Sequence, residues 1–214
     1  AKGSRIPLHK LLGNVIHKAK KLGIIKAWPS KIILYAHFIR ADFSSLSDCW
    51  QLKKRVKAVN GTLAHFQNEY GVDSDALGEK HITSDHFSIT DLDRKRHETN
   101  LYIVDTLGLT PGKKGLAFVG EMLGLPKLDI PVGYDISDIY KFCKEKPKLF
   151  EAYAIRDAEI AVKYGLLMHC FCIHELEFKS LPLSIGSMGV KLFLRTMKDN
   201  GYDFNAVFSL TSNT

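Results

Sequence analysis

The sequence predicts an α/β domain, because two short apolar runs of strand length lie between stretches with helical spacing. Residues 31–36 and 100–106 are the strand-like runs, and residues 7–25 and 147–178 carry the longest helical patterns. Strands that alternate with helices build a sheet with helices on its faces. The chain has 214 residues, of which 45% are hydrophobic, and is long enough to bury such a core.

The first third of the chain supplies a helix, a strand and a second helix. In residues 7–25, apolar side chains recur at helical spacing with lysines between them, and Gly23 ends the pattern. A Trp-Pro-Ser turn at 28–30 leads into the run KIILYA at 31–36, which predicts a buried strand. Residues 43–56 then have the pattern of a helix.

The middle of the chain is predicted to form a β-ribbon and a second buried strand. The Asn-Gly pair at 60–61 is a hairpin signal, and residues 81–90 alternate in part between apolar and polar side chains. We therefore expect a ribbon within 60–95, followed by a buried strand over the run NLYIVDT at 100–106. Residues 115–123 predict a short helix.

The last third is predicted to be helical. Residues 137–144 form a short helix, and Pro147 stands in the first turn of a long one that runs to about Phe178. Residues 185–200 form a last helix, which Gly201 closes.

The basic composition favours a polyanionic partner. Thirty Lys and Arg stand against 23 Asp and Glu, which gives a net charge of +7. Nucleic acid is the commonest such partner, although anionic membranes and acidic proteins attract the same surface. No apolar run approaches the roughly 20 residues that cross a bilayer, and the N-terminus has no signal-like stretch. We therefore expect a cytoplasmic protein that is neither secreted nor bound to a membrane.

The four cysteines do not predict a zinc site, because no CxxC pair is matched by a second one. Cys170 and Cys172 lie next to His169 and His174. Residues two apart on a helix face different ways, so we expect buried thiols rather than a metal cluster. Reduced thiols suit the cytosol.

Tyr153 and Asp157 are the strongest candidates for catalysis. They lie four residues apart on the long predicted helix and therefore share a face. A carboxylate can ligate Mg²⁺, and a phenol beside it can orient a water for phosphodiester hydrolysis. The spacing alone is weak evidence, since Tyr134 and Asp138 satisfy the same pattern. The alternative is a core tyrosine beside a solvated aspartate.

The context of this pair resembles a known family. Residues 104–107, then 115–127, then Tyr153 to Asp157 resemble the stretch that leads to the third exonuclease motif, YxxxD, of family B DNA polymerases. Tyr153 and Asp157 match both positions of that motif. The order and content of these segments make the resemblance more specific than a lone YxxxD.

The resemblance extends in both directions, over roughly residues 28–195. The strand at 31–36 followed by Asp42 resembles the second exonuclease motif. Residues 184–189 resemble the passage from the exonuclease into the polymerase. The resemblance implies an exonuclease domain at 1–180 and a linker helix at 181–214 that leads toward a polymerase domain.

The resemblance implies a ribonuclease-H-like fold, with a mixed sheet flanked by helices that lacks its first strand or strands in this chain. It also implies four carboxylates that hold two Mg²⁺ or Mn²⁺ ions. Asp157 and Asp42 would be metal ligands and catalytic residues, and Tyr153 would orient the attacking water. His37, Phe38 and Arg40 would contact nucleic acid, by a hydrogen bond, by stacking and through phosphate. A satisfied core histidine and a surface arginine are the alternatives.

The sequence departs from the family in two ways. The D-x-E motif that opens the family does not occur before Asp42. Asp105 imitates it locally, but Leu107 stands at the position of the Glu, so we expect Asp105 to be a strand-end turn residue. The metal site is therefore incomplete here, with the missing pair either upstream or lost. In the second motif, His37 replaces an Asn and Ala41 an aromatic residue.

These features predict a metal-dependent 3′→5′ exonuclease that proofreads for a family B-type DNA polymerase. Its partners would be the single-stranded 3′ end of DNA and a polymerase domain in the same polypeptide or complex. We expect it at the nucleoid or at a virus or plasmid replication site. One alternative is an inactive exonuclease-fold module that binds DNA or serves as a structural part of a larger complex. A nuclease of the same superfamily that acts on RNA is another.

Overall fold

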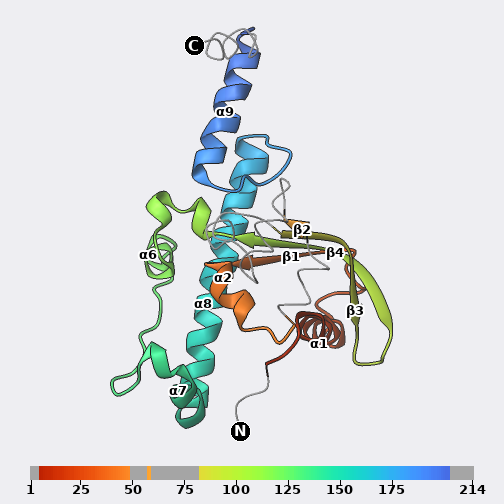
Figure 1. Ribbon diagram of the computed structural model, residues 1–214, viewed down its shortest axis with the longest axis vertical. Coiled ribbons are helices and arrows are strands. Elements are labelled where there is room, and N and C mark those ends of the chain that lie inside the picture. Colours follow the sequence, from red (N-terminus) through yellow and green to blue (C-terminus); the bar gives the residue numbers. More distant parts are fainter. Residues whose placement is uncertain (1–4, 49–56, 59–81, 203–214) are drawn as a thin grey trace.

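A four-stranded mixed sheet forms the centre of the computed structural model (Figure 1), in the order β1-β4-β3-β2. The structure describes residues 5–48, 57–58 and 82–202. Central strand β4 (Arg96–Asp105) pairs in parallel with β1 (Lys31–Ala36) and antiparallel with β3 (Ile82–Thr90). The short strand β2 (Lys57–Ala58) pairs antiparallel with β3. The sheet is flanked by helices, which confirms the predicted fold class: the arrangement is consistent with a ribonuclease-H-like fold that lacks strands.

The strands agree closely with the sequence pattern. Strand β1 has the predicted bounds, whereas β4 begins at Arg96, four residues before the predicted start. Strand β3 lies within the range predicted to form a ribbon, but its partner is β4, which was predicted as a separate strand; in the turn between them, Asp91 accepts a hydrogen bond from the backbone N–H of Lys95 at 2.9 Å. The hairpin signal at 60–61 lies outside the described residues.

One face of the sheet is covered by α1 (Leu8–Lys21) and α2 (Ile39–Ser44). Their apolar side chains meet those of the strands in a first core, which contains Leu8, Leu12, Ile16, Ile39, Phe87, Ile89, Leu101 and Ile103. The predicted helix at 43–56 was placed too late, because α2 already begins at Ile39. The backbone N–H of Ile39 donates a hydrogen bond to a side chain on a distant strand. Sequence periodicity does not reveal such a long-range contact. Residues 49–56 lie outside the described part of the chain.

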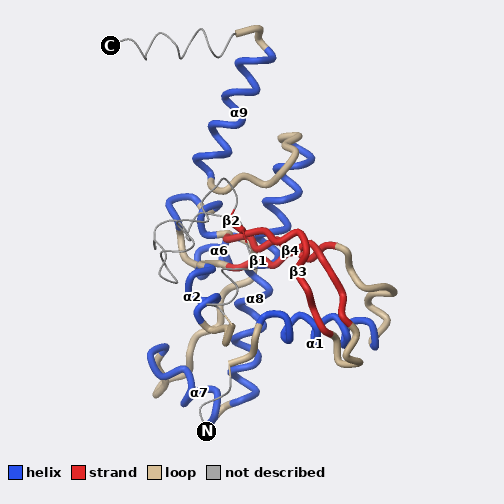
Figure 2. Tube along the Cα trace, turned by 45° about the vertical axis from the view of Figure 1, so that its right-hand side comes forward, coloured by secondary structure: helices blue, strands red, loops and turns tan. Residues whose placement is uncertain are grey.

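The other face is covered by the long helix α8 (Pro147–Cys170), which crosses the sheet in Figures 1 and 2. A second core lies here, formed by Val104, Leu109, Val119, Ile160, Tyr164, Cys172, Phe178 and Leu181. Gly165 lets α8 approach β1 closely, since a Cβ at this position would overlap the ring of Tyr35. After Cys170 the helix continues as a π-helical turn, η5 (Phe171–Glu175).

Short helices connect β4 to α8. The 3₁₀ turns η2 (Leu107–Leu109) and η3 (Pro111–Lys113) lead to α6 (Leu116–Met122), close to the predicted bounds. The 3₁₀ turn η4 (Ile136–Asp138) then precedes α7 (Ile139–Glu145). Together these segments carry the chain from the end of the central strand to the start of the long helix.

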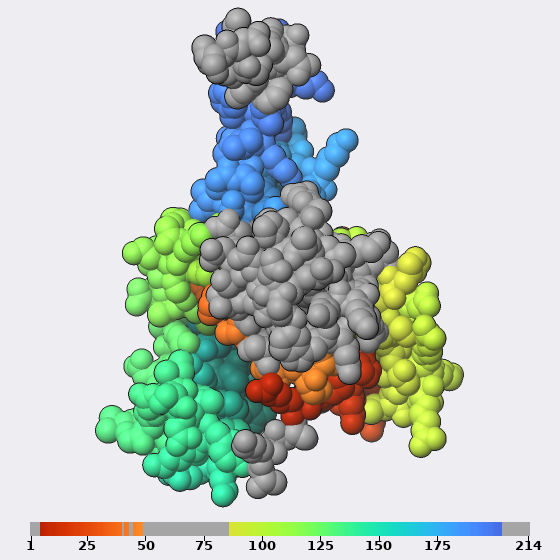
Figure 3. Space-filling model, in the orientation of Figure 1, coloured from red at the N-terminus to blue at the C-terminus, as the bar shows by residue number. Residues whose placement is uncertain are grey.

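The final helix α9 (Ile185–Asp199) projects away from the body, as the space-filling view shows (Figure 3). Ser184 and Ser187 form a capping box at its start. No residue of α9 is buried, whereas Leu181, just before it, belongs to the second core. The domain boundary at 180 stays a prediction. None of the helices that the structure describes combines the length and the apolar character needed to span a membrane.

Candidate nuclease site

The candidate site is built around Asp105, the last residue of β4. Its side chain is fully buried and accepts three backbone hydrogen bonds, from Phe38 and Ile39 at 3.0 Å and from Leu107 at 2.9 Å. Burial raises the pKa of this carboxyl, and the three N–H donors oppose that rise. Asp105 therefore fixes the turn between β1 and α2, as expected of a strand-end turn residue.

That turn places Asp42 beside the end of the sheet. Phe38 has a positive φ of 75°, which reverses the chain after β1, and α2 starts at the next residue. Asp42 lies on the solvent-exposed side of α2. Its pKa is nevertheless raised to about 6, first by the protein atoms packed around it and then by the negative charges of Asp105 and Asp157. Asp42, Asp105 and Asp157 thus share one electrostatic neighbourhood, which we call the acidic end.

Asp157 reaches the acidic end from α8, where Lys127 holds it. The Nζ of Lys127 donates a hydrogen bond to Oδ2 of Asp157 at 2.9 Å, and both side chains are about three-quarters buried, with 28% and 24% of their surface exposed. Burial opposes the charge of Lys127, but its contacts with Asp157 and Tyr153 outweigh that effect and raise its pKa. Oδ1 of Asp157 is buried without a hydrogen-bond partner among the described residues.

Lys127 was missed by the sequence analysis, which used it only as the end of a longer segment. The loop that carries it is tied to α8 by a second contact, in which Arg156 donates to the backbone oxygen of Pro126 at 3.0 Å. Both contacts span 30 residues of sequence. The only local signal was a lysine after Pro126, which by itself predicts a surface residue.

Tyr153 lies one turn before Asp157 on α8 and is 8% exposed. Its ring meets Phe142 edge-on, with 6.3 Å between ring centroids, and the Nζ of Lys127 lies 5.0 Å from its centroid. The phenol is therefore held between α7 and the lysine that binds Asp157. The structure brings Tyr153, Lys127 and Asp157 together; a catalytic role for the pair stays a prediction.

The competing YxxxD pair has local structural contacts instead. The hydroxyl of Tyr134 donates to Glu145 at 3.0 Å, which ties the preceding loop to the end of α7. Asp138 caps α7 by accepting a hydrogen bond from the backbone N–H of Lys141 at 3.3 Å. These contacts account for Tyr134 and Asp138 without a role in chemistry.

The three residues predicted to contact nucleic acid differ in how the structure holds them. His37 Nδ1 lies 3.0 Å from the hydroxyl of Thr106, and Nε2 donates to the backbone oxygen of Lys114 at 3.1 Å. Burial lowers the pKa of His37, and both ring nitrogens are engaged within the protein. Phe38 is 44% exposed beside the acidic end. The side chain of Arg40 lies outside the described part of the structure.

A metal ion fits the acidic end only in part. Among the described residues, no group of three or more His, Cys, Asp or Glu side chains converges in a way that could hold a metal. Of the two thiols expected to be buried, Cys172 is buried and Cys170 is exposed. The Oδ1 of Asp157, which has no hydrogen-bond partner in the described part of the chain, and the repulsion of Asp42 by Asp105 and Asp157 are features that a bound cation would relieve.

The chain is similar to a DNA polymerase. It is 40% identical over 200 residues to the primer-independent DNA polymerase PolB of Escherichia coli, which covers 93% of this chain and 23% of that protein. The chain thus spans about a quarter of the length of this relative. No family model matches the chain, and no solved structure matches it significantly. The similarity supports a polymerase-related domain and leaves the kind of activity open.

Proposed function

We propose that this polymerase-related chain carries a 3′→5′ exonuclease domain that removes nucleotides from the 3′ ends of DNA. The observation that carries the proposal is the state of Asp157. One of its oxygens is bound by Lys127, the other is buried without a hydrogen-bond partner among the described residues, and its negative charge acts on the carboxyl of Asp42. The similarity to a DNA polymerase supports DNA as the substrate and a polymerase domain as the partner.

Asp157 and Asp42 would hold a divalent cation, Mg²⁺ or Mn²⁺. Both are carboxylates, the ligands that these ions prefer. Asp105 already accepts hydrogen bonds from three backbone N–H groups. It would act through its charge and by positioning α2. Divalent cations in such sites activate a water and neutralise charge on the reacting phosphate.

The protein's own groups would position the reaction. Lys127 fixes one oxygen of Asp157 and thereby aims the other, which restricts the rotamers of this carboxylate. Tyr153 is held one helical turn away and would orient the attacking water through its hydroxyl. Phe38 is exposed beside Asp42 and would stack on the terminal base, an interaction that tolerates any sequence.

The remaining carboxylates of a two-metal site would come from elsewhere in a longer polypeptide. Asp42 and Asp157 supply two acidic ligands, and Asp105 is already engaged. The chain spans 23% of its polymerase relative, so there is ample sequence in such a protein from which a D-x-E segment could contribute.

A second candidate function is that of an inactive exonuclease fold retained for binding DNA. The ion pair between Lys127 and Asp157 favours it, because a lysine bound to the carboxylate neutralises the charge that a metal needs. The two candidates differ in one respect only: the first requires that a cation bind beside Asp157 despite Lys127, and the second that it does not.

The deciding assay is degradation of 5′-labelled single-stranded DNA with Mg²⁺ or Mn²⁺, by this chain and by the longest polypeptide that contains it. Stepwise shortening from the 3′ end by the longer polypeptide supports the exonuclease. Bound but uncut DNA in both samples supports the inactive module instead. A matched RNA strand, cut faster than DNA, would assign the nuclease to RNA.

A further inference from the structure

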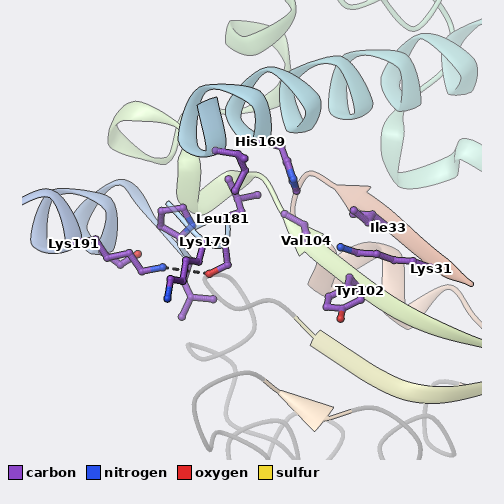
Figure 4. Close-up of a pocket in the computed structure, with 13 residues that line it drawn as sticks. Lys31, Ile33, Tyr102, Val104, His169, Lys179, Leu181 and Lys191 are labelled. Atoms are coloured by element: carbon purple, nitrogen blue, oxygen red, sulfur yellow. Dashed lines mark hydrogen bonds between the residues drawn. The ribbon is translucent and has the colours of Figure 1, made fainter. Parts of the chain in front are cut away.

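A second candidate binding site lies at the C-terminal end of α8, away from the acidic end. A pocket of about 340 Å³ opens between the sheet, the last turn of α8 and the start of α9 (Figure 4). We call it the basic pocket; it is lined by Lys31, Ile33, Tyr102, Val104, His169, Ile173, Lys179, Ser180, Leu181, Pro182, Leu183, Ser187 and Lys191. His169 follows Asp157 by 12 residues of α8, or about 18 Å of helix, so the two sites are separate.

The lining is basic and carries no acid. Three lysines reach it from three elements, Lys31 from β1, Lys179 from the loop before α9 and Lys191 from α9. Figure 4 shows Lys31 and Lys191 extending toward the pocket from opposite sides. No aspartate or glutamate is among the lining residues. Positive charge gathered in a concave site, with no acidic side chain among the residues that line it, favours a ligand that is an anion.

Lys31 and Lys191 are held only by weak contacts, so their ammonium groups remain able to bind a ligand. The Nζ of Lys31 lies 4.7 Å from the centroid of Tyr102, and that of Lys191 is 3.5 Å from the hydroxyl of Ser180. In the part of the chain that the structure describes, neither ammonium is paired with a carboxylate. The positive charge of Lys31 acts on another residue of the pocket. Burial is the main reason that the pKa of His169 is lowered, and the charge of Lys31 lowers it further.

The floor of the pocket is apolar. Ile33 and Val104 come from the face of β1 and β4 that packs against α8, and Leu181 is buried beside them. Apolar lining with a few polar groups in a pocket of a few hundred cubic ångströms is typical of a site for a small molecule. A ligand that matches this pocket has one flat apolar part and one strongly anionic part.

We propose that the basic pocket binds a nucleotide, with its phosphate groups bound by the lysines that line the pocket, Lys31 and Lys191 among them, and its base against Ile33, Val104 and Leu181. The nucleotide is either free or one unit of a DNA strand, since both present the same chemistry. An ammonium group binds phosphate as a point charge, and each base has an apolar face. The site does not depend on hydrolysis at the acidic end.

The test is a titration of the protein with dATP in EDTA, read from the NMR resonances of Tyr102 and His169 and by calorimetry. We expect saturable binding that shifts both residues, and weaker binding of deoxyadenosine and of tripolyphosphate. The variant Lys31→Gln/Lys191→Gln should bind dATP at least about tenfold more weakly. The control Lys20→Gln/Lys198→Gln loses the same charge outside the pocket and should bind as the wild type does.

Equal loss of affinity in both double variants would overturn the proposal, because it would mean attraction to net charge alone. Tripolyphosphate bound as tightly as dATP would also overturn it, since the base would then contribute nothing. An oligo-dT that shifts Tyr102 and His169 at lower concentration than dATP identifies the ligand as a DNA strand, and the reverse order identifies it as a free nucleotide. Circular dichroism of both double variants verifies that each is folded.

Discussion

The acidic end and the basic pocket both draw residues from β4 and α8, yet they hold their charges in opposite ways. At the acidic end, Asp105 accepts three backbone hydrogen bonds and Asp157 is bound by Lys127. In the basic pocket, Lys31 and Lys191 rest on an aromatic ring and a hydroxyl. The carboxylates of the acidic end are fixed by hydrogen bonds within the protein, whereas the lysines of the basic pocket are held by weaker contacts.

The comparison shows which of the two clusters of charge lowers the stability of the folded chain. Burial and then the negative charges of Asp105 and Asp157 raise the pKa of Asp42, and burial raises that of Asp105. Like charges held together are destabilising, and they persist where a function needs them. The lysines of the basic pocket are exposed, so their mutual repulsion is screened by water.

The largest expected effect on stability is that of Asp105→Ala. The change leaves three backbone N–H groups without their acceptor, in a buried turn, and we expect a loss of about 3 kcal/mol or more in the free energy of unfolding. Urea denaturation measures it. Asp138→Ala, which removes an exposed cap of α7, is the control and should cost about 1 kcal/mol. Equal losses would show that Asp105 does not organise the acidic end.

Gly165→Ala tests the helix that connects the two sites. A methyl group here would overlap the ring of Tyr35, so α8 must shift from β1 at a cost of about 1–3 kcal/mol. Gly189→Ala in α9 has no neighbour within 4 Å and should instead stabilise the chain by roughly 0.4–1 kcal/mol. A lower melting temperature for Gly165→Ala and a higher one for Gly189→Ala support this packing. A rise in the melting temperature of both variants would refute it.

Tyr153→Phe tests whether the hydroxyl of Tyr153 takes part in hydrolysis at the acidic end. Removing one hydroxyl that orients water is expected to lower the rate of 3′-end hydrolysis about tenfold, equivalent to roughly 1.4 kcal/mol, with little change in metal affinity. Tyr134→Phe is the control, since its hydroxyl contacts Glu145. The rate is measured on 5′-labelled DNA in the longer polypeptide. An unchanged rate for Tyr153→Phe would leave this tyrosine a packing role only.

The smallest effect is a pH dependence of stability due to Asp42. Its pKa is about 6 in the folded chain and 3.8 as a reference, so the folded state binds the proton more tightly. Asp42 therefore favours folding most below about pH 4, and this contribution falls as the pH rises to about 6. In EDTA, Asp42→Asn should flatten that part of the profile and be more stable than the wild type at pH 7. Parallel urea-denaturation profiles of the two proteins would contradict the shift.

Much of the fold was predictable because its signals are local. Strand β1 was predicted with its observed bounds, and α8 with its start at Pro147. The errors occurred where a distant residue decides the structure. Helix α2 begins at Ile39 because Asp105, 66 residues later, accepts its N–H. Cys170 was expected to be buried with Cys172, but the helix turns it outward.

The candidate site was predictable in part for the same reason. Tyr153 and Asp157 are visible as a pair because they are four residues apart on one helix. Lys127 was missed because its contact with Asp157 joins two elements 30 residues apart. The proximity of Asp42 to Asp157 likewise depends on the parallel pairing of β1 with β4, which periodicity alone does not reveal.

The most direct test of the account is Asp157→Ala in the longer polypeptide, compared with Glu159→Ala on the same helix. Glu159 is partly exposed and pairs with Arg156 and Lys163, so its loss should leave cleavage unchanged. Loss of Asp157 should remove stepwise shortening of 5′-labelled DNA from its 3′ end, by about a hundredfold or more, while dATP still binds at the basic pocket. If Asp157→Ala shortens DNA as fast as Glu159→Ala does, the acidic end is not a nuclease site.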